Sequence, residues 1–139
     1  MGLVETGACA FCDIIAFRAD AARLTRWDDA LAIVPLKPVT QGHIIVMPLT
    51  HVTDALQDPE VTAATMRRAA EIASRPCNII TSAGPAATQS VWHLHVHIVP
   101  RRAHDGLLLP WGDNEAHMRQ YMKNACAFYS GDVGQEEER

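Results

Sequence analysis

Three histidines alternate with apolar residues in the segment His-Leu-His-Val-His-Ile-Val at positions 93–99. In an extended strand, successive side chains point to opposite faces, so His93, His95 and His97 would share one face while the apolar residues share the other. Imidazoles on that face would lie about 6 to 7 Å apart, twice the rise per residue. A buried strand over residues 92–99, closed by a proline, is therefore expected. The imidazoles could simply face solvent, but three in strict alternation favour a metal or catalytic site.

The rest of the chain predicts an α+β fold. Asp58 before Pro59 is typical of a helix start, because the carboxylate caps free backbone N–H groups and proline fits the first helical position. Strands joined by short loops, with one long inserted helix and a C-terminal helix, favour a mainly antiparallel sheet of about five strands. Strands are expected at 23–27, 31–34, 43–47 and 78–81, and helices at 11–17, 59–74 and 113–128.

Length and composition limit the possible classes of protein. A chain of 139 residues, 48% hydrophobic, suits one domain, expected over residues 1–130 and followed by a polar tail at 131–139. The net charge of -4 and the absence of a Lys/Arg run argue against nucleic-acid binding. No apolar stretch is long enough to cross a membrane, and no secretory signal is apparent at the N-terminus, so we expect a cytoplasmic protein with reduced thiols.

Two cysteines, Cys9 and Cys12, are separated by two residues near the N-terminus. Two thiolates at this spacing can bind a tetrahedral zinc ion, but a closed site needs two more ligands. A redox dithiol is an alternative, although such a motif normally follows a strand and none is expected before Cys9. Two ordinary thiols are the simplest interpretation. His43 and His51, at either end of a predicted strand, are further candidates for a metal site or an active site.

A loop of small, neutral residues at 84–90 precedes the three histidines. Its backbone N–H groups, together with the side chains of Gln89 and Ser90, could bind a phosphate, although such a segment can also be an ordinary loop. The chain has no Walker-type phosphate loop, no dinucleotide-binding glycine motif and no serine nucleophile elbow.

The segment from His93 to Val99 resembles the signature of the histidine triad (HIT) family, His-φ-His-φ-His-φ-φ with φ apolar. The resemblance implies an antiparallel sheet packed by helices, usually in a homodimer. Other matching segments, in chain order, are Cys-x-x-Cys followed by Asp13-Ile14-Ile15, Gly42 to Pro48, His51, and Gln89-Ser90-Val91. The N-terminal segment resembles the zinc-carrying bacterial branch of the family.

The resemblance implies a hydrolase or transferase acting at the α-phosphorus of a nucleoside phosphoramidate, a dinucleoside polyphosphate or a related purine nucleotide. His95 would attack phosphorus and form a covalent nucleotidyl-histidine, which water would then hydrolyse. His97 would bind the phosphate and assist the leaving group, and His43 would support the site beside it. Gln89 and Ser90 would contact the phosphate or the leaving group.

In zinc-bearing relatives the metal ion is structural, and no organic cofactor is expected. The matching ligands are Cys9, Cys12, His51 and His93, which would form a closed site of two cysteines and two histidines. Because His93 lies two residues before His95, the ion would help to position the nucleophile without taking part in the chemistry.

Three positions depart from the family pattern. Pro35 stands where relatives usually carry the Asp or Asn that binds the ribose hydroxyls, Ser82 stands where Asn is common, and Thr88 stands where glycine is usual. All three positions bear on substrate binding. These departures leave open a nucleotide-binding module with little turnover. The cysteine pair separately leaves open a redox or metal-sensing protein centred on Cys9 and Cys12.

Overall fold

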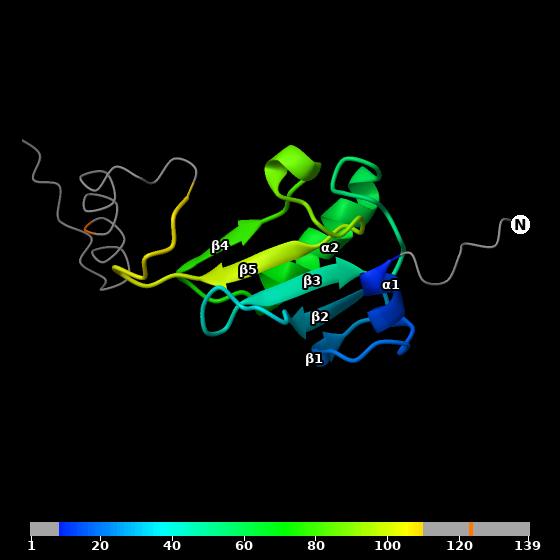
Figure 1. Ribbon diagram of the computed structural model, residues 1–139, viewed down its shortest axis with the longest axis horizontal. Coiled ribbons are helices and arrows are strands. Elements are labelled where there is room, and N and C mark those ends of the chain that lie inside the picture. Colours follow the sequence, from blue (N-terminus) through cyan, green and yellow to red (C-terminus); the bar gives the residue numbers. More distant parts are fainter. Residues whose placement is uncertain (1–8, 110–122, 124–139) are drawn as a thin grey trace, which may run out of the picture. The chain divides into compact units, whose positions relative to one another are not determined.

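The computed structural model describes residues 9–109 and Lys123. The chain divides into two units, residues 1–101 and 102–139, and the elements named here belong to the first. None of the described helices is long and apolar enough to cross a membrane. The expected C-terminal helix and polar tail lie outside the described residues. In chain order, the elements are α1 (Ala10–Ile15), β1 (Ala22–Arg26), β2 (Ala30–Val34), β3 (Ile44–Pro48), α2 (Pro59–Ile72), β4 (Cys77–Ile80), the short 3-10 helix η1 (Pro85–Ala87) and β5 (Val96–Pro100) (Figure 1).

The five strands form one sheet in the order β1-β2-β3-β5-β4, and every neighbouring pair is antiparallel. This confirms the expected α+β fold and the antiparallel sheet of five strands. Strand β5 lies between β3 and β4, so the last of the described strands is inside the sheet while β4 forms one edge. The central place of β5 holds His97 against strands on both sides, opposite Ile45 of β3 and Ile80 of β4.

The three inner strands β2, β3 and β5 are mostly buried, because both faces of the sheet are covered there and their side chains alternate between the two faces. One face packs against α2 through a cluster of small and branched residues that includes Ala69 of the helix. The other face packs against Phe11 of α1. The first cluster contains Ala30, Ala32, Val46, Ala69, Val96 and Ile98, and the second contains Phe11, Leu31, Ile33, Ile45 and Met47. The histidines of the triad thus lie on the α1 side, opposite the apolar face of β5.

Helix α2 begins as the sequence predicts. The carboxylate of Asp58 accepts hydrogen bonds from the backbone N–H groups of Glu60 at 3.0 Å and Val61 at 3.2 Å, with proline in the first turn. The helix ends at Ile72, slightly earlier than expected. Arg68 on this helix binds Asp29 in the β1–β2 turn at 2.8 Å, which ties the helix to the hairpin.

The strand expected over residues 92–99 is shorter than predicted and starts only at Val96. Pairing with β3 stops at Val46 and Val96. Two residues later Pro48, the last residue of β3, has no N–H to donate to a ladder. The segment before β5 is held instead by a hydrogen bond of 2.7 Å from the N–H of Leu94 to the carbonyl of Val52. His93 and His95 therefore precede the strand, and only His97 belongs to it.

Candidate active site and metal centre

His95 is buried, and its imidazole has a defined proton position. Its Nδ1 lies 2.7 Å from the backbone carbonyl of His93. A carbonyl can only accept a hydrogen bond, so Nδ1 carries the proton and Nε2 keeps a free lone pair. Burial lowers the pKa of His95, which favours the neutral ring. The geometry therefore presents a neutral imidazole with a nucleophilic Nε2.

His97 and His43 form a hydrogen-bonded pair. The N–H of Val39 donates to Nδ1 of His43 at 3.1 Å, so the proton of the neutral His43 ring is on Nε2. That Nε2 lies 2.9 Å from Nδ1 of His97 and donates to it, which leaves the proton of His97 on its own Nε2. Strand pairing and this hydrogen bond hold the ring of His97 in place. The position of its proton depends on two successive hydrogen bonds, the first of which comes from the backbone N–H of Val39.

The environment favours the neutral form of the rings of His43, His95 and His97. Burial, followed by the positive charges that His95 and His43 can carry, lowers the pKa of His97 to about 4. Burial also lowers the pKa of His43. The ring centroids of His95 and His97 are 5.0 Å apart. A lone pair on His95 and an N–H donor on His97 thus belong to adjacent rings, an arrangement that can act on two atoms of one phosphoryl group.

The predicted metal ligands Cys9, Cys12, His51 and His93 do come together, with their ligand atoms all within 4.8 Å of one another. A tetrahedral zinc ion, with bonds of about 2.0 Å to nitrogen and 2.3 Å to sulfur, needs separations of about 3.3 Å between nitrogens and 3.5 Å between nitrogen and sulfur. The Nδ1 atoms of His51 and His93 are 3.1 Å apart. From Nδ1 of His93 the sulfurs of Cys9 and Cys12 lie at 3.6 and 3.5 Å. The donor set and its spacing fit zinc.

The proton positions in this cluster also suit a cation. Nε2 of His93 donates to the carbonyl of Pro48 at 2.9 Å, so its Nδ1 offers a lone pair to the cluster. Burial lowers the pKa of His93 to about 4. Burial, with the hydrogen bond and charge of neighbouring Cys9, raises the pKa of the Cys12 thiol to about 11. Such a thiol loses its proton near neutral pH when a metal cation replaces it.

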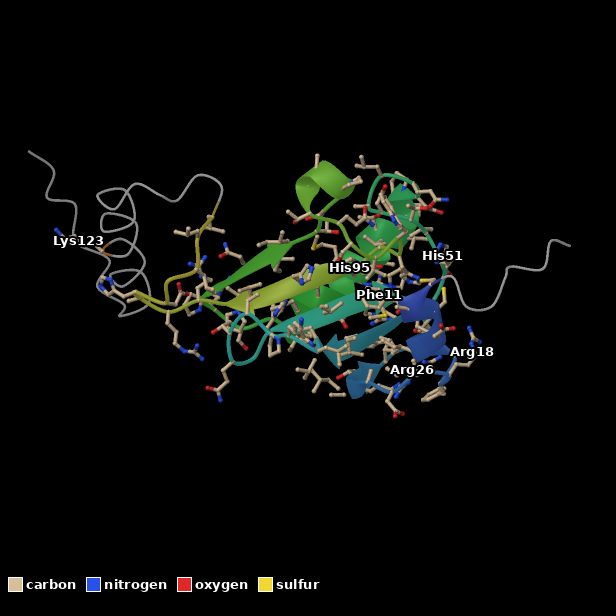
Figure 2. All side chains as sticks on the ribbon, in the orientation of Figure 1. Phe11, Arg18, Arg26, His51, His95 and Lys123 are labelled. Atoms are coloured by element: carbon tan, nitrogen blue, oxygen red, sulfur yellow. The ribbon has the colours of Figure 1, made fainter. Side chains whose placement is uncertain are left out.

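Phe11 links the metal cluster to the candidate nucleophile. It lies on α1 between the two cysteines, and its ring meets His95 edge-on with centroids 5.0 Å apart. It also meets His93 edge-on at 6.0 Å. Figure 2 shows Phe11 and His95 beside each other, as the distance between their rings requires, and His51 on the far side of Phe11 from His95 in this view. Phe11 was not among the site residues expected from the sequence, although its place inside the Cys-x-x-Cys motif could have identified it.

The loop before the triad is arranged around the buried side chain of Gln89. Its Nε2 donates to the carbonyls of Thr53 at 2.7 Å and Val91 at 3.0 Å, and its Oε1 accepts from the N–H of Gly84 at 2.8 Å. Both amide hydrogens are therefore used inside the protein, and Gln89 shapes the loop. A substrate contact from this side chain stays a prediction and would require one of these bonds to open. Ser90 beside it is exposed.

Comparison with known proteins identifies the family. The model of the HIT domain matches residues 17–104, which is more than half of the chain. The chain belongs to the HIT family. An uncharacterised HIT-like protein of Mycobacterium tuberculosis is 35% identical over 75% of this chain and 78% of its own length. An adenosine 5'-monophosphoramidase of Saccharomyces cerevisiae is 27% identical over 78% of this chain and 72% of its own.

Solved structures of HIT proteins share the fold of this chain. A protein of Streptococcus mutans matches with a TM-score of 0.72 and 29% identity, over 91% of this chain and 87% of its own. A zinc-bound histidine triad protein of Mycobacterium smegmatis matches with a TM-score of 0.65 and 30% identity, over 90% of this chain and 97% of its own. The HIT fold, the triad and a cluster suited to zinc therefore occur together in this chain.

Proposed function

We propose that this HIT protein hydrolyses purine nucleoside phosphoramidates, or related nucleotides such as dinucleoside polyphosphates, at the α-phosphorus. The observation that carries the proposal is the hydrogen bond from Nδ1 of His95 to the carbonyl of His93. It leaves Nε2 of a buried, neutral ring free for attack, next to the donor of His97. The similarity to a yeast phosphoramidase supports this class of substrate.

The chemistry follows from the proton positions. Nε2 of His95 would attack phosphorus while the bond from phosphorus to the leaving nitrogen or oxygen breaks. The Nε2–H of His97 would donate a hydrogen bond to the leaving atom or to a phosphoryl oxygen. The new nucleotidyl-histidine would carry positive charge on its ring, which the carbonyl of His93 stabilises through Nδ1–H. The leaving nitrogen or oxygen would take a proton from solvent. Water would then attack phosphorus and give a proton back to solvent, the bonding pair would return to Nε2, and the nucleoside monophosphate would be released.

The metal cluster would hold a structural zinc ion through Cys9, Cys12, His51 and His93. Four protein ligands fill the tetrahedral positions, so the ion would contribute folding free energy and leave none open for substrate. Metal binding would hold His93 in place, and the carbonyl of His93 accepts the hydrogen bond that orients the ring of His95. Zinc would thus help to orient the nucleophile. No step of the reaction passes through the ion.

The assembly we propose is a homodimer of single domains that each span residues 1–130. Strand β4 lies at the edge of the sheet, where Ile79 and Ile80 are each 38% exposed. An edge strand with exposed apolar side chains is suited to pairing with a second chain. Sedimentation of the parent protein and of an Ile80→Lys variant tests this assembly, since the charge should shift the dimer toward monomer.

The alternative is a nucleotide-binding module with little turnover. Two observations favour it: the amide of Gln89 is already occupied by backbone groups, and Pro35 offers no side-chain hydrogen bond to a substrate. In this case the protein would bind adenosine monophosphate without cleaving a phosphoramidate.

Release of nucleoside monophosphate from a panel of phosphoramidates and dinucleoside polyphosphates separates the two functions. We expect the parent protein to cleave at least one class, and His95→Asn to abolish turnover while keeping the fold and metal content. Equal turnover by His95→Asn would contradict the role of His95. Binding without cleavage by either protein would favour the module.

A further inference from the structure

The hydroxyl of Thr81 donates a hydrogen bond of 2.7 Å to the backbone carbonyl of His95. Thr81 is half-buried and follows directly after the end of β4. The ladder between β4 and β5 ends at the pair formed by Ile80 and His97. The side chain of Thr81 thus ties the two segments together where backbone pairing has stopped, at the residue that carries the candidate nucleophile.

His95 needs such a tie because it lies one residue before β5. Strand pairing begins at Val96 and does not fix the backbone of His95 itself. The ring of His95 is held on one side by the carbonyl of His93 and is packed by Phe11. Neither contact sets the peptide plane that joins His95 to Val96. The hydroxyl of Thr81 binds the oxygen of that plane, and so restricts the direction of the Cα–Cβ bond.

We propose that Thr81 is a positioning residue for the reaction of His95. Its hydroxyl fixes the His95–Val96 peptide and thereby aims Nε2 of the imidazole at phosphorus. The proposal rests on the nucleophilic role proposed for His95. A displacement of about 1 Å in a reacting group can lower a rate by about 100-fold, so a single bond to the backbone of a nucleophile can have a large effect on kcat.

Two substitutions of similar size test the hydroxyl. Thr81→Val keeps the shape and removes the donor, whereas Thr81→Ser keeps the donor and removes a methyl group. We expect Thr81→Val to lower kcat per folded molecule by about tenfold or more, with KM within about twofold of the parent, and Thr81→Ser to stay close to the parent. A parental kcat in Thr81→Val, or an equal loss in Thr81→Ser, would overturn the proposal.

A spectroscopic measurement tests the same bond independently of turnover. Long-range 1H–15N spectra report the tautomer of His95 and the exchange of its Nδ1 proton. We expect one protected Nδ1–H signal in the parent and faster exchange in Thr81→Val, while Thr81→Ser resembles the parent. Unchanged His95 signals in Thr81→Val would count against the proposal. A parent protein without turnover would contradict the enzyme, and these spectra would still decide the role of Thr81. Thr81→Ala provides the donor-free variant if Thr81→Val does not fold.

Discussion

Nε2 of His43 lies 2.9 Å from Nδ1 of His97, and the direction of this hydrogen bond determines which atom of His97 carries a proton. Because the N–H of Val39 occupies Nδ1 of His43, the proton of His43 is on Nε2. His97 accepts it and keeps its own proton on the opposite side of the ring. A backbone amide four residues before His43 therefore sets the donor that faces the substrate in the proposed reaction.

Removing the donor of His43 should impair the reaction more than it impairs the fold. In His43→Leu, Nδ1 of His97 loses its partner, the tautomer is no longer fixed, and we expect kcat to fall by at least about tenfold. In His43→Gln, the side-chain amide can reach the position of Nε2 and still donate, so part of the rate should return. Steady-state kinetics on the best substrate of the panel measures both variants, and equal rates in the two would refute a role for the donor.

The cysteines of the metal cluster should control stability more than chemistry. We expect Cys9→Ser with Cys12→Ser to lose the bound zinc and about 3 kcal/mol or more of unfolding free energy, because binding to the native state alone stabilises it. The rate per folded molecule should fall less. Metal analysis and urea unfolding measure the two effects.

Cys77→Ser is the matched control, since this half-buried thiol lies outside the cluster. It should retain full metal content. A metal-free double variant as stable as the parent would refute the structural role of zinc. Reactive thiols at Cys9 and Cys12 in the metal-loaded protein would instead favour a redox function.

Thr88 occupies a backbone conformation that its side chain disfavours. Its φ is 72°, in the left-handed region, and the residue is exposed at the end of η1. For an L residue, the left-handed conformation destabilises the native state by about 1 to 2 kcal/mol. Glycine avoids this strain, but its greater freedom in the unfolded chain lowers the unfolding free energy by about 0.5 to 1 kcal/mol. We therefore expect Thr88→Gly to raise the unfolding free energy by about 0.5 to 1 kcal/mol in urea.

Thr88→Ala separates the strain caused by any Cβ atom from the additional strain caused by a branched side chain at this position. It keeps the Cβ that clashes in the left-handed region, so it should gain less stability than Thr88→Gly. A destabilised Thr88→Gly would show that contacts of the threonine side chain outweigh the backbone strain.

The buried histidines should make the protein less stable in mild acid. The pKa of native His97 is lowered to about 4, mainly by burial, whereas an imidazole in the unfolded chain titrates at about 6.5. Below about pH 6.5 the unfolded chain gains a proton that native His97 does not, so this stability is present above pH 6.5 and is lost as the pH falls toward 4. Thermal unfolding between about pH 7.5 and pH 5 should show the decrease.

His97→Gln removes one titrating group and should flatten this pH dependence. Both proteins are compared at the same zinc concentration, because acid also weakens metal binding. Identical slopes in the two proteins would show that the pKa of native His97 is not lowered.

Several features of the site follow from the sequence alone. The spacing of Cys9 and Cys12 and the run of three histidines identified residues that lie close together in the fold. Such short-range patterns show which side chains can bind a metal or act in catalysis, and which of them share a face. The cap at Asp58 predicted the start of α2, since a helix N-terminus depends on a few adjacent residues. The antiparallel sheet was likewise predictable from strands joined by short connections.

Only the tertiary structure determined how these residues act. The alternation of three histidines suggested one continuous strand, yet His93 turns to the metal cluster and His95 stands before β5, because pairing with β3 stops at Val46 and Val96. The proton positions of His95 and His97 depend on backbone groups brought close by folding, and so does the bond from Thr81. Hydrogen bonds between residues far apart in the chain have no periodicity to detect. The sequence therefore determined which groups are present, and the packing of the sheet decided which nitrogen of each ring is free.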